Sequence, residues 1–229
     1  MPSKRFNKLP KKTRENSSES IEKLLPIVKK NCTTKFDEAI DLSFQINNKQ
    51  KKNEINLRTV VNMPGGTGKK VKVAVVCEES KSKEAKDAGA DVVGGDDLIE
   101  QIKSGDLNFE KLICTSSMMI KLSKLGKVLG PKGLMPNPKL GTVTDDVKKA
   151  IKDSKSGQVE IRNDKDGNIG VTIGKKSFTD ENLIKNYNAI IEVLEKEKSN
   201  ISIKGDLIKS LFITSTMGVS YKLKLNKNI

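Results

Sequence analysis

A run of glycine and lysine near residue 65 contains the residue types that hold phosphate groups in nucleotide-binding loops: Gly65-Gly66-Thr67-Gly68-Lys69-Lys70. Such a loop needs a glycine five residues before its Gly-Lys pair and a serine or threonine directly after it. This chain has Met63 and Lys70 at those positions, and a strand-like stretch follows instead of a helix N-terminus. A hinge is the better interpretation, and we assign to it Pro64, Gly65, Gly66 and Gly68, with Gly157 farther along.

The chain offers little for acid-base, metal or cofactor chemistry. It contains no histidine, which removes the usual general base near neutral pH and the commonest zinc ligand. Its three cysteines lie far apart, so they match neither a disulfide framework nor a paired metal-ligand spacing. The strand predicted at 71–77 is followed by Glu78 and Glu79, whose carboxylates would repel a pyrophosphate. We expect no enzyme activity, no metal and no cofactor, with an unrelated nucleotide-using enzyme as the alternative.

The charge balance indicates a polyanionic partner. The chain has 43 Lys and Arg against 29 Asp and Glu, a net charge of +14, and cations near phosphates release condensed counterions. Aromatic residues make up only 3% and Trp is absent, so phosphate contact and shape are favoured over base stacking. A generic basic surface is the competing interpretation. No apolar run suits a signal sequence or a membrane span, which predicts a soluble, cytoplasmic protein without membrane contact.

Two further segments have the residue types for RNA contact. The loop from Leu129 to Lys139 contains three prolines and two glycines around Lys132 and Lys139. This loop fits a rigid display of both cations for RNA or tRNA and equally a stiff tether between two helices. The run Thr214-Ser215-Thr216-Met217-Gly218 has small side chains that allow the close backbone approach needed to read ribose and phosphate. A plain exit from a strand is the alternative there.

The elements that would position these residues follow from hydrophobic periodicity and turn signals. Residues 1–16 are polar, basic and aperiodic, and predict a flexible arm. Ser18 opens a capped helix that bends or ends near Pro26, and residues 35–44 fit a short helix or a strand. After a strand at 56–63, strands and helices alternate, as in βαβ units around a mostly parallel sheet. The strands are expected at 71–77, 91–93 and 112–115, and the helices at 80–88, 96–103, 117–128 and 145–154.

The pattern changes after Gly157. Strand-like runs at 158–163 and 168–173 flank a hairpin turn signal, and a helix at 180–197 and a strand at 207–214 follow. Neither flank completes a sheet alone, which predicts a discontinuous α+β domain of split β-α-β type from 17–66 and 158–229, with a doubly wound, Rossmann-like α/β domain inserted at 67–157. Residues 67–159 hold 17 basic and 13 acidic side chains, net +4, and the remaining 26 and 16 give net +10. The outer domain is the better RNA candidate.

Several stretches together resemble the bacterial family of ribosomal L1 proteins, which forms the mobile stalk beside the tRNA exit site. The resemblance covers roughly residues 18–222, and its most specific parts are 128–139, 141–143, 157–159, 162–165 and 214–218. It implies a discontinuous domain that binds large-subunit ribosomal RNA, an inserted doubly wound domain and a hinge between them. It also implies help in moving or releasing deacylated exit-site tRNA, and repression of translation of its own operon through binding of that mRNA.

The resemblance also implies which residues contact RNA, in a protein that is monomeric when free and otherwise part of the ribosome. The implied contacts are Lys35, Phe36, Asp41, Ser210, Thr216, Met217 and Gly218, with Arg162 and Lys165 as additions. Lys35 would neutralise phosphate, Phe36 would pack on a ribose or base, and Thr216 with the Gly218 backbone would read 2′-hydroxyls. The chain departs from the family at Thr59, usually Gly, and at Gly65, often His, and residues 47–53 are unusually rich in Lys, Asn and Gln.

Overall fold

The computed structural model of the protein describes residues 4–9, 18–47, 57–105, 107–201 and 206–225. The chain divides into two compact units. Unit 1 comprises Met1–Gly68 and Val159–Ile229, and unit 2 comprises Lys69–Gln158. One unit is therefore made from both ends of the chain, and the other is a single continuous stretch.

Unit 1 is built on a four-stranded sheet in the order β7-β1-β8-β9. The strands are β1 (Ala39–Ile46), β7 (Asn168–Lys175), β8 (Ile208–Ser215) and β9 (Tyr221–Lys222), and each pairs antiparallel with its neighbours. Apolar and polar residues alternate along β1, so Ile40, Leu42, Phe44 and Ile46 all point to the buried face. This alternation decides between the helix and the strand that the sequence left open for residues 35–44, because a helix would scatter these four residues around its surface.

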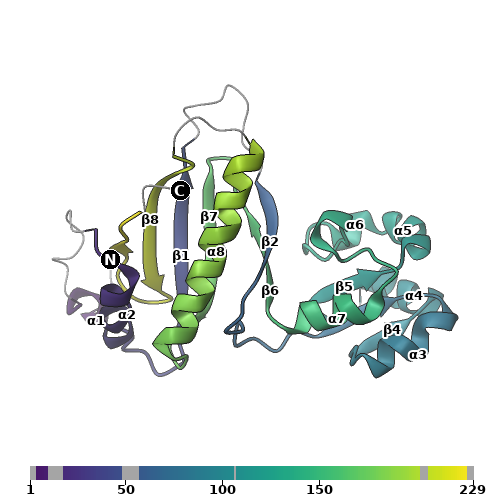
Figure 1. Ribbon diagram of the computed structural model, residues 1–229. Helices are drawn as coiled ribbons and strands as arrows, with labels where there is room; N and C mark the ends of the chain where they lie inside the picture. The colour runs from purple at the N-terminus through teal and green to yellow at the C-terminus, as the bar shows by residue number, and fades with distance from the viewer. Residues whose placement is uncertain (1–3, 10–17, 48–56, 106, 202–205, 226–229) are drawn as a thin grey trace. The chain divides into compact units, whose positions relative to one another are not determined.

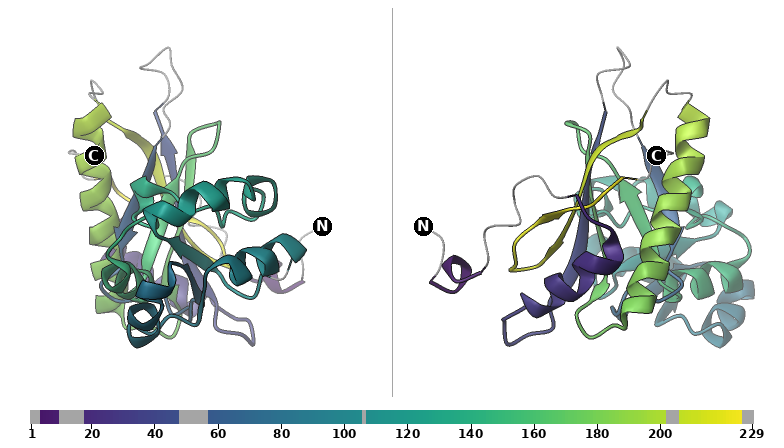
Figure 2. Two further views of the ribbon diagram at one scale, coloured as in Figure 1. Left: turned by 90° about the vertical axis from the view of Figure 1, so that its right-hand side faces the viewer. Right: turned by 60° about the vertical axis from the view of Figure 1, so that its left-hand side comes forward.

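Two helices pack on the apolar face of this sheet. They are α2 (Ile21–Lys30) and α8 (Asp180–Ile201), and Figures 1 and 2 show α8 lying along the strands. Leu25 of α2 and Leu183 and Leu194 of α8 are fully buried in one apolar cluster with the sheet residues. The sequence predicts that α2 bends or ends near Pro26; the helix continues past that proline to Lys30, so of the two alternatives the end is wrong.

The turn at Asp164 forms as the sequence predicts, but its two strands enter different sheets. The N–H of Asp164 donates to Asn168 O at 2.9 Å, and Asp164 Oδ1 accepts from Asn168 N at 2.6 Å. Strand β6 (Gln158–Arg162) pairs with β2 (Arg58–Asn62) in a separate two-stranded sheet, whereas β7 pairs with β1. A single bridge from Asn163 to Ile169 joins the two arms of the turn.

Part of the expected flexible arm packs against unit 1. Helix α1 (Lys4–Asn7) is one turn long, and the N–H of Leu9 donates to Phe6 O at 3.2 Å. Leu9 is only 7% exposed and belongs to the unit 1 core, and Phe6 packs against the same core. These two apolar side chains, spaced three residues apart among cations, explain why residues 4–9 differ from the aperiodic arm inferred from composition. Residues 10–16 lie outside the described part of the chain.

Unit 2 is a three-layer α/β structure. Its sheet has the order β4-β3-β5, with β3 (Val73–Val76) parallel to both β4 (Val92–Gly94) and β5 (Lys111–Cys114). One face packs on α4 (Asp96–Ser104), α5 (Ser116–Ser123) and α6 (Gly126–Leu129), and the other on α3 (Glu79–Asp87) and α7 (Val147–Lys155). Helices on both faces of a parallel sheet define the doubly wound class.

The single helix predicted over 117–128 is two shorter helices in the structure. Helix α5 ends at Ser123 and α6 begins at Gly126. Glycine has a low helix propensity, so Gly126 offers little resistance to a break at this point. The 3-10 turn η3 (Pro138–Leu140) follows in the proline-rich loop.

The fold class predicted from the sequence is confirmed, because both units show the expected arrangement of strands and helices. Within the described ranges, no helix is both long and apolar enough to cross a membrane.

Candidate nucleic-acid interface

The second face of the unit 1 sheet is polar and carries no helix among the residues that the structure describes. We call it the open face and define it by the side chains of β1, β7 and β8 that point away from the core. Three cross-strand rows are fixed by the register of the strands. The rows are Thr172, Asp41 and Thr214; Gly170, Ser43 and Phe212; and Asn168, Gln45 and Ser210.

Hydrogen bonds between side chains order this open face. The hydroxyl of Thr172 donates to Asp41 Oδ1 at 2.5 Å, and Ser210 Oγ donates to Gln45 Oε1 at 3.3 Å. Short polar side chains held in this way present hydroxyls, an amide and a carboxylate at fixed positions. Such groups suit 2′-hydroxyls and ribose oxygens, which both donate and accept hydrogen bonds.

Gly170 lies in the middle row of the open face, on the edge strand β7, and leaves room for an approaching molecule. A Cβ built at Gly170 meets nothing within 4 Å, and its strand conformation needs no glycine. The residue is exposed between Thr172 and Asn168 on β7. A larger side chain here would fill space in front of the sheet without displacing any atom of the protein.

Two loops meet at one end of the open face, and together we call them the rim. One is residues 31–38 before β1, and the other is residues 216–220 after β8. Thr216 joins them, because its N–H donates to Ala39 O at 3.0 Å and its Oγ1 accepts from Ala39 N at 3.0 Å. The Thr216 hydroxyl, assigned to RNA from the sequence, therefore also has a structural role.

A buried carboxylate holds both rim loops. Glu38 is fully buried; its Oε1 accepts from Thr34 N at 3.2 Å and Thr34 Oγ1 at 2.7 Å, and its Oε2 accepts from Met217 N at 3.2 Å. Burial alone would raise the pKa of Glu38, but hydrogen bonding from Thr34, the Ser215 hydroxyl and the Met217 backbone holds it below its ordinary value of 4.5. Glu38 is therefore ionised at neutral pH and fixes Met217 relative to the loop that carries Phe36.

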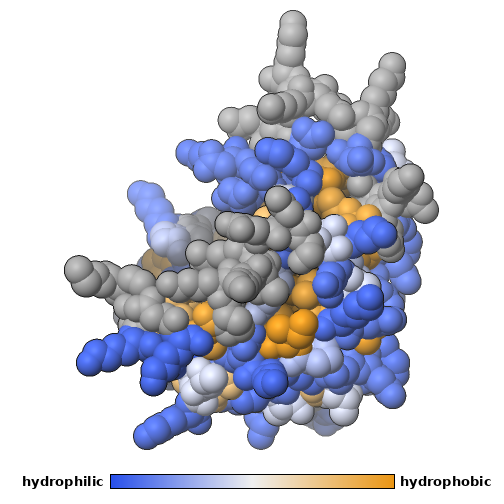
Figure 3. Space-filling model, turned by 90° about the vertical axis from the view of Figure 1, so that its left-hand side faces the viewer, coloured by the Kyte–Doolittle hydropathy of each residue, from blue (hydrophilic) through white to orange (hydrophobic). Residues whose placement is uncertain are grey.

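Each rim loop exposes one large apolar side chain. Phe36 is 53% exposed and Met217 is 50% exposed. Figure 3 views the molecule from the left-hand side of Figure 1 and shows apolar atoms at the surface among hydrophilic residues. Exposed apolar groups beside polar ones are suited to packing on ribose or base faces.

Gly218 is required by the tight turn of the second rim loop. A Cβ at this position would lie 2.2 Å from Ser215 Oγ, and the N–H of Gly218 donates to Ser215 O at 3.1 Å. A side chain at this position would require the buried Ser215 hydroxyl to rotate away. This explains why the Thr214–Gly218 run ends in glycine.

The other predicted contacts are divided between the rim and the opposite end of the open face. Lys35 is exposed on the first rim loop, whereas Ser210 lies near the opposite end of the open face. Arg162, in β6, and Lys165, in the turn before β7, are exposed at that far end, where Ile46 N donates to Gly167 O at 2.8 Å. With about 3.4 Å per residue, the seven steps of β1 from Ala39 to Ile46 separate the two ends by roughly 24 Å. The predicted residues thus border the open face at both ends.

Sequence reasoning missed the middle of this surface. Ser43, Gln45, Phe212, Gly170 and Thr172 were not predicted. The strict alternation of apolar and polar residues from Ile40 to Ile46 contains the signal, because it places Asp41, Ser43 and Gln45 on one face. Their partners on β7 and β8 depend on register, which one sequence does not provide.

Two of the glycines assigned to the hinge, Gly65 and Gly68, are closely packed in unit 1. Asn186 on α8 is fully buried and clamps the segment: its Oδ1 accepts from Gly65 N at 2.7 Å, and its Nδ2 donates to Gly66 O at 2.9 Å. A Cβ at Gly65 would lie 2.9 Å from Asn182 O, and one at Gly68 would lie 3.0 Å from the Phe178 ring. Pro64–Gly68 is therefore bound to unit 1.

The proline-rich loop of unit 2 presents one of its two predicted cations clearly. Lys132 is exposed next to Gly133, which has a φ of 69°. Lys139 lies in the turn η3, and the position of its side chain is outside what the structure describes. The turn is closed by Thr142 Oγ1, which accepts from Asn137 N at 2.7 Å.

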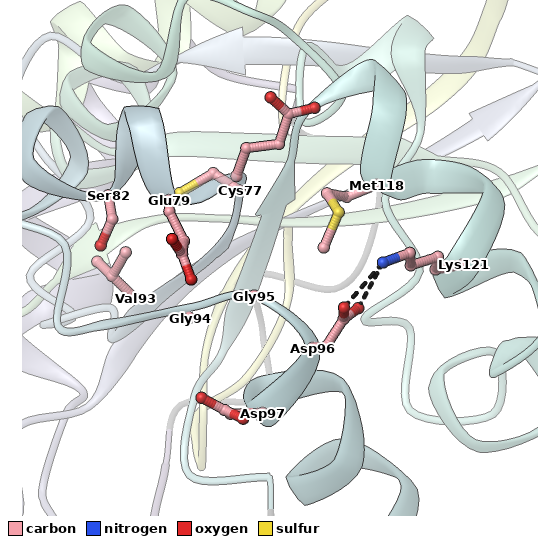
Figure 4. Close-up of a pocket in the computed structure, with 11 residues that line it drawn as sticks. Cys77, Glu79, Ser82, Val93, Gly94, Gly95, Asp96, Asp97, Met118 and Lys121 are labelled. Atoms are coloured by element: carbon pink, nitrogen blue, oxygen red, sulfur yellow. Dashed lines mark hydrogen bonds and ion pairs between the residues drawn. The ribbon is translucent and has the colours of Figure 1, made fainter.

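Unit 2 contains a cavity of about 460 Å³ at the carboxyl ends of β3 and β4 (Figure 4). Ligands of doubly wound proteins bind at this edge of the sheet. The lining is acidic, and its cation, Lys121, is bound to both oxygens of Asp96 at 2.7 and 2.9 Å. The carboxylates are those of Glu78, Glu79, Asp96 and Asp97. They would repel a pyrophosphate, which argues against the nucleotide-using enzyme.

The basic charge and the two-unit α/β arrangement, with one unit made from both chain ends, are consistent with the fold of the L1 class of ribosomal proteins. The chain matches the Ribosomal protein L1p/L10e family over residues 28–219 and belongs to that family, as its sequence motifs predicted. The family comprises structural proteins and is not a known class of enzyme. The chain is thus a constituent of the large ribosomal subunit and is located with the ribosome in the cytoplasm.

Three relatives show how far the similarity extends, and each is named large ribosomal subunit protein uL1. The protein from Pelagibacter ubique is 72% identical over 229 residues, covering 100% of both chains. The one from Prochlorococcus marinus is 45% identical over 225 residues, 98% of this chain and 95% of the relative. The one from Rickettsia africae is 45% identical over 210 residues, 92% and 86% of the two chains.

Proposed function

We propose that unit 1 binds a folded element of large-subunit ribosomal RNA with the open face and the rim. The observation that carries this proposal is the open face itself, a sheet face of ordered hydroxyl, amide and glycine positions next to two loops that expose Phe36 and Met217. Each loop brings one large apolar side chain to the edge of the polar face, where it can pack on a sugar or a base.

Each part of the surface has a distinct task in this proposal. Phe36 and Met217 pack on sugars or bases, and Thr214 and Ser210 contact ribose hydroxyls. Lys35, Arg162 and Lys165 neutralise phosphates at the two ends of the open face. Phosphate contacts supply affinity and shape selects the RNA, because the backbone of a bent RNA fits a curved sheet only in one register.

The experiment adds a side chain at Gly170. Gly170→Gln fills open space in front of the sheet, so we expect a normal far-ultraviolet spectrum and unfolding midpoint but at least about a tenfold loss of affinity for stalk ribosomal RNA in filter binding, equivalent to about 1.4 kcal/mol. The matched control is Gly126→Gln in unit 2, where a Cβ also meets nothing within 4 Å. Equal affinity of the two variants would exclude the open face.

We propose that the loop of unit 2 contacts exit-site tRNA. Lys132 is exposed on it, and the prolines and the Asn137–Thr142 hydrogen bond restrict its shape. Lys132→Met should slow release of deacylated tRNA from ribosomes that carry the variant. The control is Lys103→Met, which removes one charge from an exposed position of α4. Unchanged release would leave the loop with its structural role as a tether.

We propose that bending between the units uses residues 69–72 and 156–158. The Asn186 clamp holds Gly65 and Gly66, so Pro64, Gly65, Gly66 and Gly68 supply the fixed base of the hinge. Gly157, with a φ of 99°, allows a turn that other residues rarely adopt. Asn186→Leu should broaden the distribution of distances between spin labels on the two units.

We propose that the protein represses translation of its own operon, and that it binds the operon mRNA with the same open face. One surface can serve both RNAs if the mRNA mimics the ribosomal element in shape. A competition assay tests this: stalk RNA and the operon mRNA should displace each other, and Gly170→Gln should weaken both. Displacement by any structured RNA of equal length would instead support the generic basic protein.

A further inference from the structure

The N-terminal segment Lys4–Leu9 lies on the rim. Arg5 Nη1 donates to Thr33 Oγ1 at 2.7 Å, and Arg5 Nη2 donates to the carbonyl oxygen of Met217. Thr33 belongs to the first rim loop and Met217 to the second. One guanidinium therefore connects the segment to both loops, 28 and 212 residues away in sequence.

The segment is fixed on this site by more than Arg5. Leu9 is buried in the unit 1 core, Phe6 packs against that core, and Lys8 N donates to Arg5 O at 3.1 Å. Two apolar anchors and a helical turn thus set where the basic side chains stand. Lys4 and Lys8 are exposed on either side of Arg5.

Without this segment, the rim has no excess of positive charge for RNA. Lys35 is exposed on the first rim loop, and Lys176 donates from its Nζ to Cys32 O at 2.8 Å in the same loop. Asp37, Glu38 and Asp41 lie at or near the start of β1, so these two positive charges stand against three negative ones. Lys4, Arg5 and Lys8 add three positive charges and reverse the balance.

We propose that Lys4–Leu9 is a built-in cationic part of the RNA-binding surface, with Arg5 as the residue that both positions Met217 and contacts a phosphate. A guanidinium has five N–H donors in a planar fork, and the two bonds above leave three for a phosphate beside Met217. Lys4 and Lys8 neutralise neighbouring phosphates. This inference rests on the proposed RNA binding by the rim. It adds that Lys4–Leu9, a segment outside the sheet, binds phosphates of the same RNA.

The test compares Arg5→Met with Lys23→Met, a matched loss of one charge from the exposed side of α2. Affinity for stalk ribosomal RNA is measured by filter binding at several salt concentrations, and folding by urea unfolding. Arg5→Met should bind at least about tenfold more weakly. Its slope of log affinity against log salt concentration should be shallower by more than about 0.9, the value for a single phosphate contact. More than one contact is lost because Lys4 and Lys8 also lose their fixed positions. Lys23→Met should change neither quantity.

Two further variants separate the roles of Arg5. Arg5→Lys keeps the charge but a single ammonium does not bridge both loops, so it should keep most of the salt slope and lose affinity. Binding by Arg5→Met that equals the wild type would overturn the proposal, and tighter binding would show that the segment covers the rim and inhibits. If Gly170→Gln binds RNA weakly while Arg5→Met binds normally, RNA binding by the open face is supported and RNA binding by Lys4–Leu9 is excluded. If both variants bind normally, the proposed RNA binding by the open face and the rim is wrong.

Discussion

Replacing Glu38 by glutamine should disrupt the rim although the two side chains have almost the same size. Thr34 N, Thr34 Oγ1 and Met217 N each donate a hydrogen bond to the Glu38 carboxylate. A carboxylate accepts on both oxygens, whereas a glutamine amide has one acceptor and one NH₂ donor. In either orientation of the glutamine amide, its NH₂ group would point at a backbone N–H, either that of Thr34 or that of Met217. The hydrogen bond to one of the two rim loops would then be lost.

The expected size of this effect follows from the number of bonds. Hydrogen bonds to a charged group contribute about 1.5–3 kcal/mol each, and an unsatisfied buried donor costs about 1–3 kcal/mol. One lost bond with one unsatisfied N–H predicts a loss of about 2–4 kcal/mol in the free energy of unfolding. Because a domain has about 5–15 kcal/mol in total, the variant should still fold.

Urea unfolding and RNA filter binding on the same preparations test this reasoning. The control is Asp37→Asn, the exposed neighbour that accepts from Ser177 N at 3.1 Å and Ser177 Oγ at 2.8 Å. We expect Glu38→Gln to lose stability and at least about tenfold in RNA affinity, and Asp37→Asn to lose under about 1 kcal/mol of stability. Equal stability of the two variants would refute the assignment of Glu38 as the residue that holds both rim loops.

Four other outcomes are expected. Since the pKa of Glu38 is lowered, its stabilisation is present above its unfolded value near 4.5 and lost as the pH falls through the folded value; the stability gap between wild type and Glu38→Gln should be constant at pH 5–8 and narrow below. Met217→Asp should weaken RNA binding without unfolding, as filter binding and circular dichroism will show. Lys35→Ala should give a shallower salt slope. Cys32, Cys77 and Cys114 are buried, and burial raises the pKa of Cys114 to about 11, so a thiol reagent should label them only after unfolding.

The sequence was sufficient for the fold class because its signals were local. Alternating strands and helices identified the parallel sheet of unit 2, and the turn at Asp164 was visible from its residue types. The exceptions were also local in cause. Gly126 allows a break that periodicity alone did not predict, and Pro26 is accommodated inside α2 because packing of Leu25 and Val28 on the core outweighs its cost.

The candidate site was only partly predictable because it depends on register. Thr216 and Met217 stood out in the sequence through a motif, but Glu38 did not, since nothing local shows that a charged residue at the start of β1 is fully buried. Gly170 and Ser43 are neighbours because of the antiparallel register between β1 and β7, which one sequence does not reveal. The position of Arg5 depends on contacts with residues 28 and 212 positions away.

The turn from Thr216 to Gly218 shows why substitutions there differ in what they report. Thr216 bonds Ala39 through its backbone and its hydroxyl, so Thr216→Val removes a framework contact together with any contact to RNA. A Cβ at Gly218 would lie 2.2 Å from Ser215 Oγ, so a change there displaces the Ser215 hydroxyl first. Met217 differs from both, because its backbone makes the bonds to Glu38 and Arg5 while its side chain is half exposed. At Met217 the backbone therefore has the structural role and the side chain is free to contact RNA. A side-chain change at Met217 leaves in place the hydrogen bonds that hold the rim.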